Sequence, residues 1–203
     1  MKKNSPLLVI VSSPSGAGKT TLCRKLLAEF GDLRFSTSHT TRKPRPGEVN
    51  GQDYHFVSDS DFDGMIENDL FIEWAWVHGN RYGTARAEIR AAANQGNDLI
   101  FDVDFQGARQ ISEQYEGAVR VFVLPPSIEE LQRRLRARGT ENSESLNTRF
   151  KAALQEIAQH DIFDYLVVND ELEVAYDQLR SVVVAERVRH ERMAHVAEEM
   201  LDF

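Results

Sequence analysis

The sequence of 203 residues has one cysteine, Cys23, and no apolar run of membrane-spanning length. A single cysteine excludes an internal disulfide and is typical of a reducing compartment, so a cytoplasmic location is expected. The apolar run Leu7–Val11 is too short to cross a bilayer and continues directly into SSPSGAGK. We therefore expect no membrane partner and no cleavable leader.

Basic residues are also in the minority. The chain has 24 Lys and Arg against 32 Asp and Glu, a formal net charge of −8, which argues against general nucleic-acid binding. With 41% hydrophobic and 28% charged residues, it has the composition of a globular protein, and its length suits one domain over residues 1–203. We expect Cys23 to be a packed helix residue, with a reactive thiol as the alternative.

Apolar runs of strand length alternate with stretches of helical periodicity. The expected strands are Leu7–Val11, Leu99–Val103, Val119–Leu124 and Tyr165–Val168, and the expected helices are Thr21–Phe30, Arg86–Asn94, Gly107–Tyr115, Ile128–Arg138 and Ser145–His160. Strands that are apolar on both faces and separated by helices predict an α/β fold, with a parallel sheet covered by helices on both faces. A last amphipathic pattern, Glu171–Phe203, predicts a long helix with one break and is compatible with a homo-oligomer.

Two segments depart from this rhythm. Phe35–Val77 contains Pro44, Pro46 and short alternating pieces such as Tyr54–Val57, which predict a small, mostly β insertion on the α/β scaffold. The second segment, Arg138–Ser145, links two helical patterns and is a candidate mobile loop.

The stretch VIVSSPSGAGKTTL, Val9–Leu22, matches the phosphate-binding pattern G-x-x-x-x-G-K-[ST] except that Ser13 replaces the first glycine. A buried strand precedes it and a helical pattern follows, as a P-loop requires. In such a loop backbone N–H groups surround the phosphates, Lys19 reaches the β- and γ-phosphates, and Thr20 holds Mg²⁺. The expected nucleotide-binding residues are Ser13, Pro14, Ser15, Gly16, Ala17, Gly18, Lys19 and Thr20. A glycine-rich turn without a ligand is the alternative, but it would need neither the lysine nor the threonine.

Charged side chains elsewhere suggest the second half of a site. Arg42 and Arg45 are guanidinium groups braced by prolines, which suit bidentate phosphate binding, although a solvated basic loop is the alternative. Asp102 ends an apolar strand, where a carboxylate can hold Mg²⁺ through water, and Asp104 shares its face. Either aspartate could instead cap the following helix. Glu73 lies among apolar residues and needs a donor partner, unless it is an edge-strand residue facing water.

These motifs together resemble the guanylate kinase family, nearly end to end. The resemblance is carried by the pattern SxSxTTRxPRxGExxGxDYxF from Ser36 to Phe56, FIEWAWVHGNRYGT, DVDFQG, RRLRARGTE and VND. It implies transfer of a phosphoryl group from ATP to GMP, and also dGMP, in purine nucleotide metabolism, with Mg²⁺ as cofactor. No catalytic base is needed, because the attacking phosphate of GMP has a second pKa of roughly 6.

The resemblance also implies roles for single residues. On the GMP phosphate it implies Arg42, Arg45, Tyr54 and Tyr82, and around guanine it implies Ser38, Glu73, Thr84 and Asp104. It places Asn169 near the adenine of ATP. It implies a catalytic set of Lys19 with the lid arginines Arg134, Arg138 and Arg149. The corresponding division of the chain is an α/β core of residues 1–35, 85–137 and 150–203, a GMP-binding insertion of residues 36–84, and a helical lid of residues 138–149.

Alternatives remain at this level. The lid arginines could form a solvated basic face that pairs with Glu130 and Glu141, an interpretation that we prefer for Arg133 and Arg136. The whole chain could be a non-catalytic interaction module, or a kinase for another phosphorylated acceptor such as a ribose bisphosphate. The presence of Lys19, Thr20 and the lid arginines argues against the module, and the pair Ser38 and Glu73 argues against another acceptor.

Overall fold

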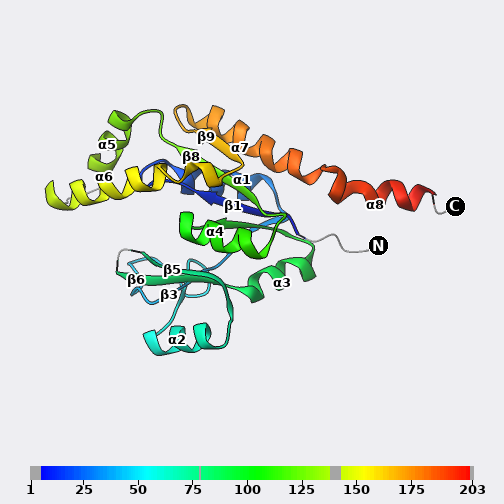
Figure 1. Cartoon of the computed structure of the whole chain (residues 1–203), viewed down its shortest axis with the longest axis horizontal. Coiled ribbons are helices and arrows are strands. Elements are labelled where there is room, and N and C mark those ends of the chain that lie inside the picture. The colour runs from blue at the N-terminus through cyan, green and yellow to red at the C-terminus, as the bar shows by residue number, and fades with distance from the viewer. Residues whose placement is uncertain (1–5, 78, 138–142, 202–203) are drawn as a thin grey trace.

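The computed structural model of the chain describes residues 6–77, 79–137 and 143–201 and contains two β-sheets (Figure 1). The larger is a five-stranded parallel sheet. In spatial order its strands are β2 (Leu33–Phe35), β7 (Asp98–Asp102), β1 (Leu8–Ser12), β8 (Val119–Leu124) and β9 (Tyr165–Val168). The four strands expected from the sequence are confirmed within one residue. The three-residue β2 was missed because so short a run carries little pattern.

Helices cover both faces of this sheet, as predicted. On one face lie α1 (Lys19–Glu29) and α7 (Leu172–Arg187), and on the other lie α3 (Arg86–Gln95) and α4 (Phe105–Gln114). The central strand β1 alternates between them: Val9 packs toward α1 and α7, and Ile10 toward α3 and α4. Both side chains are 0% exposed, which explains the uninterrupted apolar run.

Cys23 belongs to the core beneath α1. Its side chain is fully buried among the apolar residues between α1 and the sheet. Burial raises the pKa of its thiol to about 12, so the thiolate form is suppressed at neutral pH. The expectation of a packed rather than reactive cysteine is therefore confirmed.

The insertion folds into a separate, four-stranded mixed sheet. In spatial order its strands are β4 (His55–Phe56), β3 (His39–Thr40), β6 (Asn80–Ala85) and β5 (Phe71–Val77). It also contains a helix, α2 (Asp59–Glu67), that the composition did not suggest. Ser58 accepts a hydrogen bond from the Asp61 N–H while the Asp61 carboxylate returns to Ser58, so the SDSD sequence is a capping box that marks the helix start.

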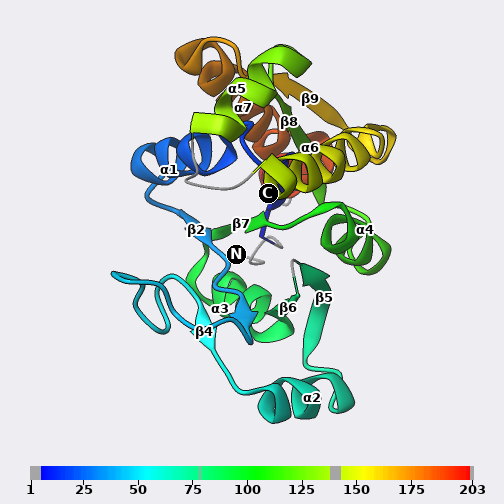
Figure 2. The same ribbon diagram turned by 90° about the vertical axis from the view of Figure 1, so that its left-hand side faces the viewer.

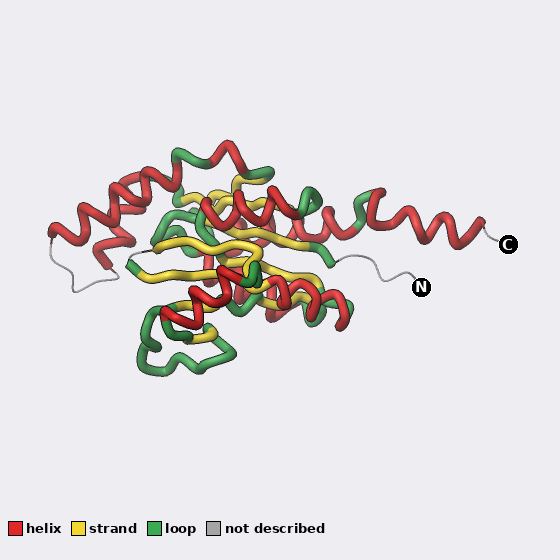
Figure 3. Tube along the Cα trace, turned by 60° about the horizontal axis from the view of Figure 1, so that its bottom comes forward, coloured by secondary structure: helices red, strands yellow, loops and turns green. Residues whose placement is uncertain are grey.

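Two helical extensions leave the body at opposite ends (Figure 3). At one end, α5 (Ile128–Ala137) and α6 (Ser143–Ile157) pack on each other through Leu131, Leu135 and Ala153. At the other, α8 (His190–Leu201) follows α7 after the single expected break and buries none of its residues, all of which are described. Within the described ranges, no helix combines the length and the apolar character needed to cross a membrane.

The first test addresses the central strand. Ile10→Ala should lower the free energy of unfolding by about 2–5 kcal/mol, because it leaves a cavity at a fully buried site. Leu166→Ala on the edge strand β9 is the control, because Leu166 is 49% exposed; its loss should stay below about 1 kcal/mol. Urea unfolding measures both. Equal losses would contradict the assignment of β1 as the core strand.

Candidate active site

One cleft of about 360 Å³ is lined by residues of both sheets. Figure 2 shows the four-stranded sheet and α2 below the larger sheet and its helices. The predicted site residues that line the cleft are Ser13, Pro14, Ser15, Gly16, Gly18, Lys19, Thr20, Ser38, Arg42, Arg45, Tyr54, Glu73, Tyr82, Asp102 and Asp104. The P-loop motif and the insertion motif, which are separate in the sequence, therefore face a common space.

The loop between β1 and α1 has the backbone of an anion-binding turn. Gly16 and Gly18 have φ angles of 97° and 96°, which a side chain would strain. No side chain of the described residues caps α1, so the N–H groups of Lys19 and Thr20 at its start can turn to an anion, while that of Thr21 donates to the backbone oxygen of Gly18. Among non-glycine residues in the described ranges, only Asp69 has a positive φ. Ser13 therefore has ordinary backbone angles, and a glycine is not required there.

Asn169, directly after β9, supports this loop. Its Nδ2 donates to the backbone oxygen of Ala17 at 2.7 Å, and its side chain is buried. A Cβ atom built on Gly18 would lie 2.2 Å from that same Nδ2, so the loop and the amide are in close contact. Ala17 is likewise buried, and its side chain belongs to the core that contains α1 and α7. The place of Asn169 near adenine stays a prediction.

The lysine of the loop is paired across the sheet edge. Lys19 Nζ forms an ion pair with Asp102 at the end of β7 and lies 3.5 Å from the backbone oxygen of Val103. Burial alone would favour the neutral amine, but the attraction and hydrogen bond of Asp102 hold the pKa of Lys19 above its ordinary value. Lys19 is thus a cation at neutral pH.

On the insertion, the Arg42 guanidinium is held by a carboxylate. Its two terminal nitrogens donate to Glu48 at 2.8 and 3.0 Å, and its Nε donates to the Tyr82 hydroxyl at 3.1 Å. Glu48 also accepts from the backbone N–H of Arg45 at 2.6 Å. The sequence analysis gave Glu48 no role, although its place three residues after Arg45 was a usable signal. The two arginines share one carboxylate and face the cleft together.

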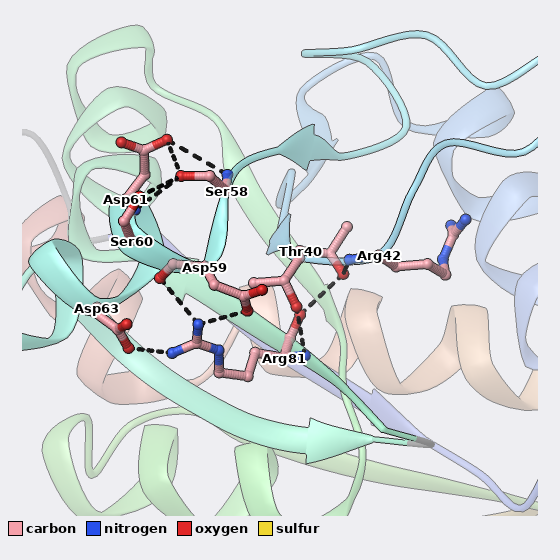
Figure 4. A network of polar contacts seen from close by, with 9 residues as sticks. Thr40, Arg42, Ser58, Asp59, Ser60, Asp61, Asp63 and Arg81 are labelled. Atoms are coloured by element: carbon pink, nitrogen blue, oxygen red, sulfur yellow. Dashed lines mark hydrogen bonds and ion pairs between the residues drawn. The ribbon is translucent and has the colours of Figure 1, made fainter.

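A second network holds the strand beneath Arg42 (Figure 4). Arg81 on β6 forms ion pairs with Asp59 and Asp63 of α2, and it is only 6% exposed. Its backbone oxygen accepts from the Thr40 hydroxyl at 2.9 Å, and that hydroxyl accepts from the N–H of Arg42 at 3.1 Å. The chain leading to Arg42 is therefore fixed to both β6 and α2.

The carboxylate on β5 is buried. Glu73 is 4% exposed, so the alternative of an edge-strand glutamate facing water is wrong, even though β5 is an edge strand. Burial raises its pKa to about 7; hydrogen bonds from Thr84 oppose this rise, and the nearby charge of Asp104 adds to it. The Thr84 hydroxyl also lies 3.2 Å from that of Ser38. The structure thus brings Ser38, Glu73 and Thr84 together.

Asp104 caps α4, the alternative that the sequence had left open. Its Oδ1 accepts from the N–H groups of Gln106 and Gly107, both at 3.0 Å. Its Oδ2 accepts from the Gln106 side chain at 2.9 Å. Asp104 also lines the cleft, so a part in base binding remains compatible with its position and stays a prediction.

Two of the three lid arginines lie in described residues and reach the P-loop region. Arg149 donates from Nη2 to the Ser15 hydroxyl at 3.0 Å. Arg134 donates from Nη2 to the backbone oxygen of Asn169 at 3.1 Å. Arg138 lies outside the described residues.

Glu130 distinguishes the arginines that neighbour each other on α5. It pairs with Arg134 at 2.7 Å and with Arg133 at 2.6 Å. The Arg133 side chain is 71% exposed, in agreement with the preferred reading of a solvated charge, whereas that of Arg134 is 22% exposed.

Glu156 is a cleft residue that the sequence analysis missed. It lies on α6 seven residues after Arg149, two helical turns along the same face, and this spacing was the available signal. Burial raises its pKa to about 7, while the charge of Lys19 and the N–H of Ser15 oppose the rise. Its Oε2 is buried and has no hydrogen-bond partner in the described part of the chain.

The donor set suits a divalent metal only in part. Thr20 and Asp102 both line the cleft, but the described residues contain no cluster of three or more His, Cys, Asp or Glu side chains that could hold a metal. A hydroxyl and a carboxylate beside a phosphate-binding loop fit a metal whose remaining ligands are phosphate oxygens and waters.

The raised pKa of Glu73 predicts how the free energy of unfolding depends on pH. The folded protein binds this proton more tightly than the unfolded chain, so stability falls as pH rises from about 4.5 to about 7. A shift of that size corresponds to about 3 kcal/mol. Glu73→Gln removes the titration. The variant should therefore gain stability relative to the parent between pH 4.5 and 8, by up to that amount, in urea unfolding without ligand.

The exposed Glu67 at the end of α2 provides the control, since Glu67→Gln makes the same change from carboxylate to carboxamide at the surface and reports the effect of the substitution itself. A difference between Glu73→Gln and the parent that stays constant from pH 4.5 to 8 would contradict the burial of a titrating carboxylate at this position.

Comparison with known proteins agrees with this geometry. A family model described as "Guanylate kinase" matches residues 5–186. The guanylate kinase of Geobacter metallireducens is 48% identical over 200 residues, covering 98% of each chain. That of Geobacter sulfurreducens is 48% identical over 198 residues, again covering 98% of each.

A solved structure shows the same fold. The crystal structure of guanylate kinase from Anaplasma phagocytophilum superposes with a TM-score of 0.77 at 33% identity, covering 94% of this chain and 90% of that one. The family model, the two relatives and the solved structure each match most of the chain, and their common family agrees with the P-loop and the insertion that face each other here. The chain therefore belongs to the guanylate kinase family.

Proposed function

We propose that the cleft holds ATP on the P-loop and GMP on the four-stranded sheet, so that the two substrates meet between the sheets. Membership of the guanylate kinase family makes the chain a phosphotransferase that converts ATP and GMP to ADP and GDP. The observation that carries the assignment of sites is that one cleft is lined by Lys19 and Thr20 on one side and by Arg42, Arg45 and Glu73 on the other.

On the ATP side, the P-loop supplies backbone donors and one cation. The N–H groups at the start of α1 would take the phosphate oxygens, and Lys19 would exchange its partner Asp102 for the β- and γ-phosphates. Thr20 and Asp102 would hold Mg²⁺, which when bound with ATP neutralises phosphate charge.

The GMP side of the cleft has two parts, one for the phosphate of GMP and one for its base. Arg42, Arg45, Tyr54 and Tyr82 line the first half, where Glu48 already fixes the Arg42 fork. Glu73, with Ser38 and Thr84, forms the second. Guanine offers N1–H and N2–H₂ donors that satisfy a buried carboxylate, which stabilises its charged form.

The transfer needs alignment more than proton removal. A GMP phosphate oxygen, already largely ionised because the second pKa is roughly 6, forms the new bond to the γ-phosphorus as the bond to the ADP oxygen breaks. The barrier is the approach of two anions. Lys19, Arg134 and Arg149 would stabilise the charge on the migrating group, and residues 138–149 would act as a lid over it, with residues 36–84 as the GMP-binding insertion.

The test measures ADP formation with GMP, AMP, UMP and a ribose bisphosphate as acceptors. GMP should be used far better than the others, and Lys19→Met should lower kcat by about 10²–10³-fold or more, because the migrating phosphoryl group loses its cation. Lys25→Met is the control: Lys25 lies on the same helix, pairs with the exposed Glu173 and should leave kcat unchanged.

Thermal unfolding of both lysine variants shows whether they fold. A folded Lys19→Met protein with parental kcat would refute the role of Lys19. Turnover of a ribose bisphosphate in preference to GMP would refute the acceptor, and no turnover of any acceptor would favour an interaction module.

A second test addresses the lid arginines. Arg149→Ala should lower kcat by about 10²-fold with little change in the KM for GMP, because Arg149 reaches the P-loop at Ser15 and not the GMP half. Arg133→Ala should do little, because that side chain is mostly exposed. Steady-state kinetics of both variants decide the matter, and equal, mild effects would mean that these arginines form only a solvated surface.

A further inference from the structure

The strand that carries Glu73 has a helix, not a strand, on its outer side. In the four-stranded sheet β5 is an edge whose one partner among the described strands is β6, and α4 lies along its other side (Figures 1 and 2). Exposed edge groups of a strand must find other partners or water. Here they find side chains of α4.

Two glutamines of α4 take the place of a neighbouring strand. The Gln110 carboxamide accepts from the N–H of Trp74 at 3.0 Å and donates to the backbone oxygen of Trp74 at 2.9 Å. One turn further along, Gln114 donates to the backbone oxygen of Ile72 at 2.7 Å. A carboxamide has the same donor and acceptor as a peptide group, so Gln110 pairs with Trp74 as a strand residue would.

These bonds lie on either side of Glu73 in the chain. Ile72 and Trp74 are its two neighbours, and both are tied to α4. The same helix also packs directly against the Glu73 carboxylate, since a Cβ atom built on Gly107 would lie 2.8 Å from Glu73 Oε2. The position of this carboxylate is therefore set by α4 as well as by its own sheet.

Helix α4 also connects the position of Glu73 with the parallel sheet. It begins at Phe105, capped by Asp104, directly after β7 ends at Asp102. The two glutamines thus link the strand that carries Glu73 to the helix that follows β7, whose last residue Asp102 pairs with Lys19. These contacts restrict how far Glu73 can move relative to the helix, which is what a well-aligned binding site requires of the residues around it.

We propose that Gln110 is a positioning residue for base recognition, which holds the Glu73 carboxylate where it accepts from both N1–H and N2–H₂ of guanine. This rests on the proposed function, in which Glu73 contacts the base. A carboxylate displaced by a loosened edge keeps its charge, but its two oxygens no longer align with N1–H and N2–H₂ at the same time. The contact to the 2-amino group then weakens. Discrimination against a base that lacks this group should therefore suffer first.

The experiment compares GMP with IMP, whose hypoxanthine base lacks the 2-amino group. Gln110→Met keeps the length and helix propensity of the side chain but removes both bonds to Trp74. We expect the ratio of kcat/KM for GMP to that for IMP to fall at least 10-fold, with the KM for ATP unchanged. Gln110→Glu retains the acceptor for the Trp74 N–H but sets a carboxylate oxygen against the Trp74 carbonyl oxygen, so the ratio should fall in this variant as well.

Arg109→Met, on the exposed side of the same helix, is the matched control and should keep the parental ratio. All assays are run well below the unfolding temperature of each variant. If Gln110→Met leaves the ratio of kcat/KM for GMP to that for IMP unchanged, Gln110 is only a structural residue and the inference is wrong, whether or not the unfolding temperature falls. The same holds if the variant lowers activity on GMP and IMP equally and raises the KM for ATP. If the parent protein itself does not use GMP, it is the proposed function that fails.

Discussion

The parallel pairing of β1 with β7 and β8 is the constraint on which the site depends. It places the carboxyl ends of adjacent strands at one edge, with Val11 level with Asp102 on one side and with Val121 on the other. The P-loop leaves this edge after β1, and Asn169 leaves it after β9, whose last residue Val168 pairs with Leu124. The contacts of Lys19 with Asp102 and of Asn169 with Ala17 follow from this arrangement.

Charge in the cleft is organised in the same way on both sides. Lys19 is paired with Asp102, and Arg42 with Glu48, before any substrate is present. A buried cation without a partner is costly, and these carboxylates remove that cost in the free protein. In the proposed binding mode, anionic substrates replace or share these partners. The cleft therefore holds local cations although the net charge of the whole chain is −8.

Glu73 and Glu156 differ from Lys19 and Arg42 because burial outweighs the interactions that favour their charged form. Both are carboxylates in the cleft whose pKa is raised by burial to about 7. Glu73 receives hydrogen bonds from Thr84, which are weaker compensation than a cation. A carboxylate held in this state is destabilising in the free protein and gains most when a ligand brings donors, a common relation between stability and binding. The small sheet that carries Glu73 is also held by Arg81, which pairs with α2, and by Gln110 and Gln114 of α4.

The sequence by itself determined the parallel strands, the covering helices, the P-loop and the arginine-bearing insertion. Local patterns specify each of these features: apolar runs, helical periodicity, and glycines where φ must be positive, as at Gly16 and Gly18. The tertiary structure alone decided which polar groups pair across long stretches of the chain. The pairing of Lys19 with Asp102, of Asn169 with Ala17 and of Gln110 with Trp74 depends on where side chains point once the segments are packed. Local patterns set which face of an element is buried, whereas hydrogen-bond partners far apart in the chain are chosen by the packing that brings them together.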